Sequence, residues 1–203
     1  LNAKGMGFLY DQVEMPLADV HFSMESIGFA LDRSVLVNLH EEFSKRQTEL
    51  AEQIYAQAGE RFNILSTKQL GVILFEKLGL PPQKKNKTGY STDSDTLEAL
   101  KDRHPIVPLI TEYRFIAKVD ATFVEGLLKS IAEDGRVHTS FKQCVTATGR
   151  ISSAEPNLQN IPVRTAEGRE IRKAFVASPG NVLVGADYSQ IELRLLAHIR
   201  GDE

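Results

Sequence analysis

The stretch GADYSQIELRLLAHI, residues 185–199, places an acidic side chain at the junction of two predicted elements. The apolar run VLV at residues 182–184 precedes it and is typical of a buried strand, and the apolar spacing that follows predicts a helix. Asp187 would lie where the strand ends, and Glu192 about one turn into the helix. A carboxylate fixed there, beside the carbonyl of Tyr188, suits a divalent cation. A lone Asp in this position also suits a plain helix cap, which the position alone favours.

A second dense segment, TATGRISSAEPNLQNIP at residues 146–162, is rich in side chains that donate hydrogen bonds. Gly149, Pro156 and Pro162 favour a loop. Read as a binding surface instead, the segment would offer these donors to the hydrogen-bond acceptors of a ligand. Its candidate donors are Arg150, Asn157, Gln159 and Asn160.

Together the two segments resemble the family A DNA polymerases, the bacterial polymerase I type. DYSQIELR is similar to the family's first metal-binding palm motif, and TGRISSAEPNLQNIP to its primer–template motif. The resemblance implies that Asp187 is catalytic and ligates two Mg²⁺ ions, with help from the backbone carbonyl of Tyr188. It also implies that Glu192 packs where a ribose 2′-hydroxyl would lie and so favours deoxynucleotides. The same nucleotide pocket would include Ser189, Gln190 and Ile191.

The resemblance assigns the donors of the second segment to the primer–template duplex, whose minor groove presents A N3 and T O2 acceptors in both orientations of an A·T pair. It further implies DNA contacts outside that segment. Arg164 is expected to meet a backbone phosphate, and the segments NxxSxxQL and KTGYST look like the family's thumb tips. Helix starts there have free N–H groups that bind phosphate, although solvated caps explain them equally well. The expected tip residues are Asn63, Ser66, Lys68, Lys87, Ser91 and Thr92. Three residues spaced four apart match duplex-facing positions of one helix: Arg114, Lys118 and Thr122. Asp120 stands where relatives often carry Lys, which is expected to weaken local DNA affinity.

The spacing of apolar residues predicts an α+β fold. Within residues 14–31 a helix is expected that stops at Gly28, with apolar positions Val20, Met24 and Ile27 on one stripe. A long helix should follow its cap Asp32 and end near Gly59, with a buried stripe of Leu36, Leu39, Phe43, Leu50 and Ile54. Further helices are expected after Ser66 and from 105 to about 132, the last as one helix or two separated near Asp120. Alternation over residues 137–143 predicts a strand, with further strands at 171–177 and 182–187. The repeating strand–helix units of a doubly wound sheet are missing.

With the resemblance, this pattern predicts three parts. Residues 1–13 would be a linker from an upstream exonuclease-like domain, and residues 14–134 a helical thumb-like subdomain. Residues 135–203 would be the first part of an antiparallel-sheet palm, truncated before the fingers.

Composition narrows the class of protein. The chain has 203 residues, 42% of them hydrophobic, which is enough for an ordinary core. A net charge of −3 gives no bulk attraction for nucleic acid, so any DNA contact must be local. No apolar run nears the roughly 20 residues that cross a bilayer and no signal peptide is present, so no membrane partner and a cytoplasmic setting are expected. The single cysteine and five scattered histidines do not support a zinc protease or a hydrolytic triad.

The function predicted is that of a fragment of a DNA-directed DNA polymerase. The parent would add deoxynucleotides to a primer 3′ end in replication or repair, as a monomer that binds primer–template DNA, deoxynucleoside triphosphates and two Mg²⁺ ions. Because Leu1 is not an initiator methionine, the chain is expected to be a piece of a longer protein. The fingers and a second metal carboxylate should follow Glu203, so the fragment itself is expected to be inactive. Two alternatives stay open: a non-catalytic relative that serves as a DNA-binding or scaffolding module, and a helical interaction domain whose polar tips never touch nucleic acid.

Overall fold

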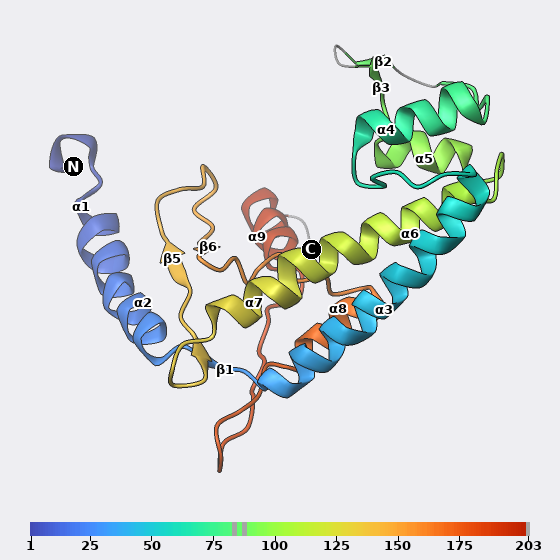
Figure 1. The fold of residues 1–203 in the computed structure, drawn as a ribbon. Helices are drawn as coiled ribbons and strands as arrows, with labels where there is room; N and C mark the ends of the chain where they lie inside the picture. The colour runs from blue at the N-terminus through green and yellow to red at the C-terminus, as the bar shows by residue number, and fades with distance from the viewer. Residues whose placement is uncertain (83–84, 87–88, 202–203) are drawn as a thin grey trace.

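The computed structural model describes residues 1–82, 85–86 and 89–201. Its central element is the long helix α3 (Arg33–Ala58) (Figure 1). Asp32 caps α3, since its Oδ1 accepts a hydrogen bond from the amide of Ser34 at 2.9 Å. Gly59 ends the helix in the left-handed conformation, with φ of 74°. The buried stripe confirms the predicted one and comprises Leu36, Leu39, Phe43, Leu50, Ile54 and Ala58.

A second helical rod runs back along α3 in the opposite direction (Figure 1). It consists of α6 (Ile106–Val119), the π-helical turn η4 (Asp120–Val124) and α7 (Glu125–Ser130). The predicted break near Asp120 is thus a wider turn inside one continuous rod. The pair encloses two hydrophobic clusters, one around Leu36 and Val124 and the other around Ile54 and Ile110.

A small helical tip caps the far end of the pair. It contains α4 (Thr67–Gly71), η3 (Val72–Lys77), β2 (Lys85–Asn86), β3 (Gly89–Tyr90) and α5 (Ser94–Leu100). Ser66 caps α4 and Asp93 caps α5, each by accepting a backbone N–H three residues on. The tip is therefore held by local caps and by its own buried leucines.

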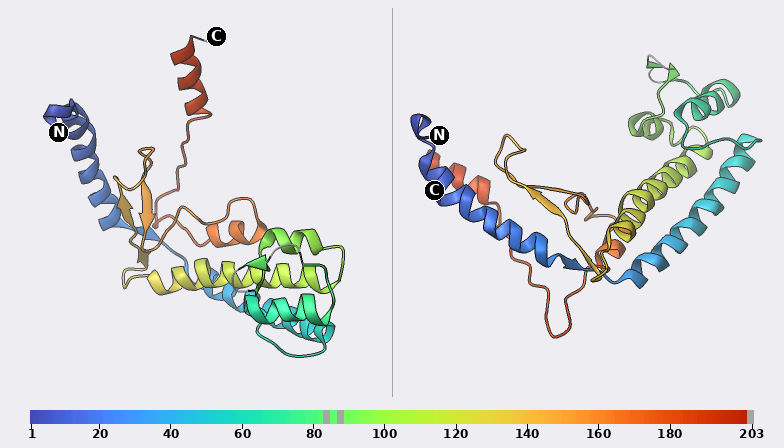
Figure 2. Two further views of the ribbon diagram at one scale, coloured as in Figure 1. Left: turned by 90° about the horizontal axis from the view of Figure 1, so that it is seen from above. Right: turned by 60° about the vertical axis from the view of Figure 1, so that its left-hand side comes forward.

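The N-terminal segment forms an arm that diverges from the helix pair (Figures 1 and 2). It contains η1 (Asn2–Lys4), α1 (Gly7–Leu9), η2 (Tyr10–Glu14) and α2 (Met15–Ile27). The predicted apolar stripe of Val20, Met24 and Ile27 is exposed, because α2 packs instead through His21 onto Phe141, with ring centroids 5.4 Å apart. Gly28 ends α2 as predicted, with φ of 64°.

Short antiparallel strands join the arm to the rest. Within the described residues there are three two-stranded sheets, which pair β1 (Phe29–Ala30) with β4 (Arg136–Val137), β2 with β3, and β5 (Ser140–Lys142) with β6 (Ser152–Ala154). Helices α8 (Ala166–Arg172) and α9 (Ile191–Arg200) complete the chain, and α9 starts where the sequence predicted a helix. The α+β class is confirmed. None of the helices in the described ranges combines the length and apolarity needed to cross a bilayer.

Two predicted strands are wrong. Residues 171–177 contain the end of α8 and a single bridge at Phe175, because Thr165 caps α8 by accepting the amide of Gly168 and so starts a helix there. Residues 182–187 form no strand, since no other described segment pairs with them; Val182 and Val184 are 80% and 85% exposed. An apolar run becomes a strand only where a partner accepts its backbone hydrogen bonds.

Asp120 faces the inside of the helix pair. It is 4% exposed, and its carboxylate contacts Nδ1 of His40 at 2.9 Å and accepts a hydrogen bond from Gln47 at 3.3 Å. The hydrogen bond to Asp120 is the main reason that the pKa of His40 is raised. Glu125 lies beside them but pairs with Lys129, so we interpret the group as a structural ion-pair network rather than a metal site. The carboxylate of Asp120 is therefore buried and paired within the protein, and weaker local DNA affinity stays a prediction.

A close contact between α8 and the preceding loop gives a test of this packing. A Cβ added at Gly168 would lie 2.1 Å from the carbonyl oxygen of Pro162, so Gly168→Ala must push α8 and Ile171 out of the core. We expect the free energy of unfolding to fall by about 1–3 kcal/mol or more. Gly126→Ala is the matched control, because its nearest contact would be 3.8 Å and Ala favours the helix by about 0.5–1 kcal/mol. Urea denaturation followed by circular dichroism measures both; equal effects would contradict the packing.

Candidate metal and nucleic-acid site

Asp187 lies in an exposed segment without regular structure, four residues before α9. Gln190 is the N-cap residue of that helix and adopts left-handed φ and ψ of 55° and 40°, and no side chain, that of Asp187 included, forms a cap hydrogen bond. The plain capping interpretation is therefore excluded. An exposed carboxylate beside a backbone carbonyl offers the hard oxygen ligands that Mg²⁺ prefers, so Asp187 and Tyr188 fit the predicted cation.

A sharp corner carries the chain from Asp187 into α9. Nε of Arg194 donates to the carbonyl of Ser189 at 2.9 Å and fixes the turn that the left-handed Gln190 makes. Glu192 consequently lies in the first turn of the helix, on the exposed face. Helix α9 stands apart from the α3–α6 pair (Figure 2).

The two predicted motifs meet in space. Nη2 of Arg150, in the loop between β5 and β6, lies 3.4 Å from Oε1 of Glu192. Both side chains are mostly exposed, at 78% and 73%, so the ion pair adds little to the stability of the fold. Its significance is that it shows the two motifs to be neighbours in space. Our sequence reasoning missed this contact, although the opposite charges in the two motifs were a signal for it.

The predicted duplex-binding segment is shaped by its own hydrogen bonds. The side chain of Gln159 accepts from the amide of Ser153 at 3.1 Å and donates to the carbonyl of Ile151 at 3.0 Å. Oδ1 of Asn157 accepts from the amide of Gln159, whereas Asn160 and Arg164 project from the surface. Gln159 therefore acts here as a brace for the segment.

A small cavity joins this segment to the helix pair. Its volume is about 100 Å³, and Thr122 of η4 lines it together with Asn157 and Asn160. The structure thus brings together one residue predicted on the helix stripe and two predicted in the duplex-binding segment.

The tip residues are mostly engaged within the protein. Oδ1 of Asn63 accepts from the amide of Leu65, and Ser66 is a helix cap. Ser91 and Thr92 are 3% and 4% exposed, while Lys68 is exposed and Lys87 lies outside the described residues. Contact between these residues and DNA stays a prediction.

Arg114 staples the tip to α6. Its Nε donates to the carbonyl of Ile64 at 3.2 Å, and Nη1 donates to the carbonyl and hydroxyl of Thr92 at 2.7 and 3.2 Å. Burial of the guanidinium lowers its pKa. Arg114 lies with Lys118 along a groove of about 620 Å³. Of the three residues predicted on the helix stripe, Lys118 and Thr122 are exposed, whereas Arg114 forms hydrogen bonds within the protein.

Comparison with known proteins connects these features to one family. Residues 33–203 match the model for DNA polymerase family A. The chain is 56% identical over 197 residues to DNA polymerase I of Caldicellulosiruptor bescii, covering 97% of this chain and 23% of that protein. It is 55% identical over 197 residues to DNA polymerase I of Bacillus subtilis, covering 96% and 22%. The chain thus spans less than a quarter of the length of these relatives.

A solved structure is similar in fold. The POL domain of Pol1 from M. smegmatis, in complex with DNA primer–template and dNTP, superposes with a TM-score of 0.86 at 43% identity. The match covers 96% of this chain and 35% of that chain.

The staple formed by Arg114 can be tested by a conservative change. Arg114→Lys replaces the planar fork, which donates from two separate nitrogens to the carbonyls of Ile64 and Thr92, by one ammonium, so we expect a loss of about 1–3 kcal/mol in unfolding free energy. Lys118→Ala, on the exposed side of the same helix, should stay within about 0.5 kcal/mol of wild type. Urea unfolding measures the free energy of unfolding of both variants. An Arg114→Lys variant as stable as wild type would show that the staple is unimportant.

Proposed function

Because the chain belongs to DNA polymerase family A, we propose that it forms the thumb and the first part of the palm of a DNA-directed DNA polymerase. The observation that carries the proposal is the meeting of the two motifs, where Arg150 and Glu192 lie 3.4 Å apart. In this proposal residues 1–13 connect to an upstream domain, residues 14–134 are the thumb, and residues 135–203 begin the palm. The complete protein would work as a cytoplasmic monomer in replication or repair.

The proposed reaction is nucleotidyl transfer. The primer 3′-hydroxyl gives up its proton to solvent, its oxygen forms a bond to the α-phosphorus of a deoxynucleoside triphosphate, the bond from that phosphorus to the bridging oxygen breaks, and pyrophosphate leaves. Asp187 and the carbonyl of Tyr188 would hold Mg²⁺, because they are exposed oxygen ligands that no cap consumes. When bound, a pair of such ions stabilises the attacking and leaving oxygens.

Selection of the sugar would fall to the corner before α9. Glu192 would occupy the space of a ribose 2′-hydroxyl, and Ser189, Gln190 and Ile191 would line the same pocket. Support comes from the turn before the helix, in which Nε of Arg194 donates to the carbonyl of Ser189 at 2.9 Å and so places Glu192 in the first helical turn.

The DNA duplex would lie along the surface shared by the palm segment and the thumb. Arg150, Asn157 and Asn160 would face the minor groove, and Gln159 would brace them. Arg164, Lys118 and Lys68 are exposed cations suited to phosphate. The helix starts at the tip would add backbone N–H groups near Asn63, Ser66, Ser91 and Thr92. Arg114 would shape this surface, Thr122 would complete it, and Lys87 is proposed from its motif alone.

The role of Asp187 separates an active polymerase from a non-catalytic relative. In the full-length protein we expect Asp187→Asn to lower the rate of primer extension by at least about 100- to 1,000-fold, the scale of losing one preorganised charge-stabilising group. Primed-duplex affinity should change little, and Asp102→Asn at the exposed tip serves as the control. Extension at the wild-type rate by Asp187→Asn would refute the proposal.

Salt dependence tests the proposed DNA contacts. If Arg164 neutralises one phosphate, Arg164→Ala should reduce the slope of log affinity against log salt by about 0.9. Arg33→Ala, an exposed cation at the start of α3 without a proposed phosphate contact, should leave the slope unchanged. Arg150→Ala should weaken the binding of all duplex sequences alike. Fluorescence anisotropy with several primed duplexes measures both quantities. A strong sequence preference, or a slope unchanged by Arg164→Ala, would contradict the assignment.

A further inference from the structure

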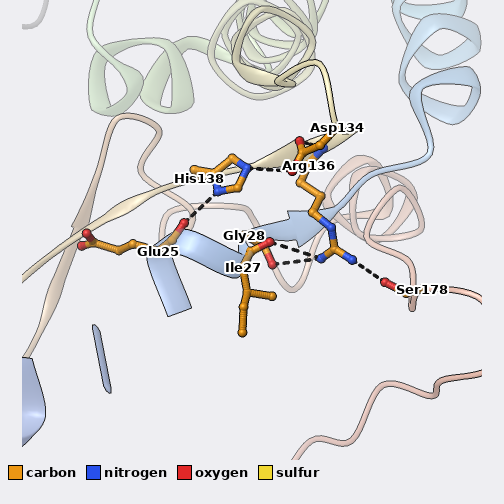
Figure 3. Close-up of polar contacts among 7 residues, drawn as sticks. All are labelled: Glu25, Ile27, Gly28, Asp134, Arg136, His138 and Ser178. Carbon is orange, nitrogen blue, oxygen red and sulfur yellow. Dashed lines mark hydrogen bonds and ion pairs between the residues drawn. The ribbon is translucent and has the colours of Figure 1, made fainter. Parts of the chain in front are cut away.

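Three segments far apart in sequence meet where the N-terminal arm joins the rest of the protein (Figure 3). They are the end of α2 at residues 25–28, residues 134–138 around β4, and Ser178 after α8. His138 and Arg136, from the same strand region, make the polar contacts among them. We propose that His138 is a pH-sensitive clasp that holds the end of α2 against β4 while its ring carries two protons, and loosens it when one is lost.

The ring of His138 faces an acceptor on each side. Its Nδ1 lies 2.7 Å from the carbonyl oxygen of Glu25, and its Nε2 lies 3.2 Å from Oδ2 of Asp134. A carbonyl and an ionised carboxylate can only accept, and a neutral imidazole has a single N–H to donate. Both contacts are therefore hydrogen bonds only when the ring is an imidazolium.

The surroundings of the ring act on its pKa in opposite directions. The hydrogen bond to the backbone carbonyl of Glu25 and that to Asp134 raise the pKa of His138, while desolvation of the ring and the nearby charge of Arg136 lower it. The net shift is upward from the ordinary value near 6.5. A raised pKa in the folded state means that the clasp contributes fully below pH 6.5 and is lost as the pH rises through the folded-state value. The carboxylate of Glu25 is engaged elsewhere, since it accepts from the amide of Phe141.

Arg136 makes a second clasp between the end of α2, β4 and Ser178. Its Nη1 donates to the carbonyls of Ile27 and Gly28 at 3.4 and 3.3 Å, and Nη2 donates to Oγ of Ser178 at 2.5 Å. A guanidinium keeps its charge at every pH at which proteins are studied. Above the transition, Arg136 would still hold the end of α2, so loss of the His138 proton loosens the joint without releasing it.

The ring is seated directly against the backbone of the arm. A Cβ at Gly28 would lie 2.7 Å from two ring atoms, and Gly28 has φ of 64°, so only glycine fits between the ring and the end of α2. The side chain of His138 is still 32% exposed, which lets its protons exchange with solvent. Because no side chain lies between the ring and the backbone of Gly28, a shift of the ring should directly displace the end of α2.

The protonation state can be read directly by NMR of the 203-residue chain. Long-range ¹H–¹⁵N correlation of the imidazoles, with His138 assigned by His138→Gln, should show both nitrogens protonated at pH 6 and a midpoint above 6.5. Asp134→Asn removes the charged acceptor and should lower that midpoint. A ring that stays singly protonated down to pH 6, or a midpoint indifferent to Asp134→Asn, would overturn the proposal.

The mechanical consequence has its own readout. After correction for intrinsic exchange, the amide protection of residues 24–28 should fall several-fold between pH 6 and pH 8.5, while that of α3 stays constant. In His138→Gln the protection should not respond to pH, whereas His104→Gln, at the distant tip, should keep the wild-type response. An identical fall in wild type and His138→Gln would overturn the clasp. Should His138→Gln fold poorly, Asp134→Asn must show the fall at lower pH.

Discussion

The antiparallel packing of α3 against α6 and α7 is the constraint on which the rest of the structure depends. One uninterrupted helix of 26 residues, about 39 Å long, passes through both hydrophobic clusters, with Leu36 in the first and Ile54 in the second. Leu109 and Tyr113 pack against both clusters, so the tip cannot tilt relative to the base without exposing one of them. The separation between the groove at the tip and the cavity at Thr122 is therefore set by helix geometry.

Side chains with a proposed function lie on segments that this rigid pair positions, while their own precision comes from local hydrogen bonds. Gln159 braces the duplex-binding segment, Arg194 fixes the corner before α9, and Arg114 ties the tip to α6. At the other end the arm depends on His138 and Arg136, which bind backbone carbonyls at the end of α2. The residues proposed to contact ligand are thus held in place by hydrogen bonds from neighbouring residues. Several of them also have a hydrogen-bond partner within the protein.

Local patterns in the sequence predicted what local forces decide. The stripe of α3, its Gly59 end and the start of α9 were all readable, because periodicity and helix ends depend on residues within a few positions. The run at residues 182–184 was misread as a strand, since pairing depends on a partner that no local pattern contains. The four-residue spacing of Arg114 and Lys118 placed them on one side of a helix but did not reveal that Thr92 would meet Arg114. The contact of Asp120 was hidden from local patterns as well, because His40 lies 80 residues away in the sequence.

The central claim is that Asp187 and the carbonyl of Tyr188 hold the divalent cation of a polymerase beside the end of a primer. Iron-mediated cleavage tests it most directly, because Fe²⁺ bound in place of Mg²⁺ generates radicals that cut the nearest backbone. With full-length protein, primer–template and ascorbate, the account predicts cleavage within a few residues of Asp187, competed away by excess Mg²⁺. Cleavage confined to other regions, such as the His40 and Glu125 cluster, would contradict it.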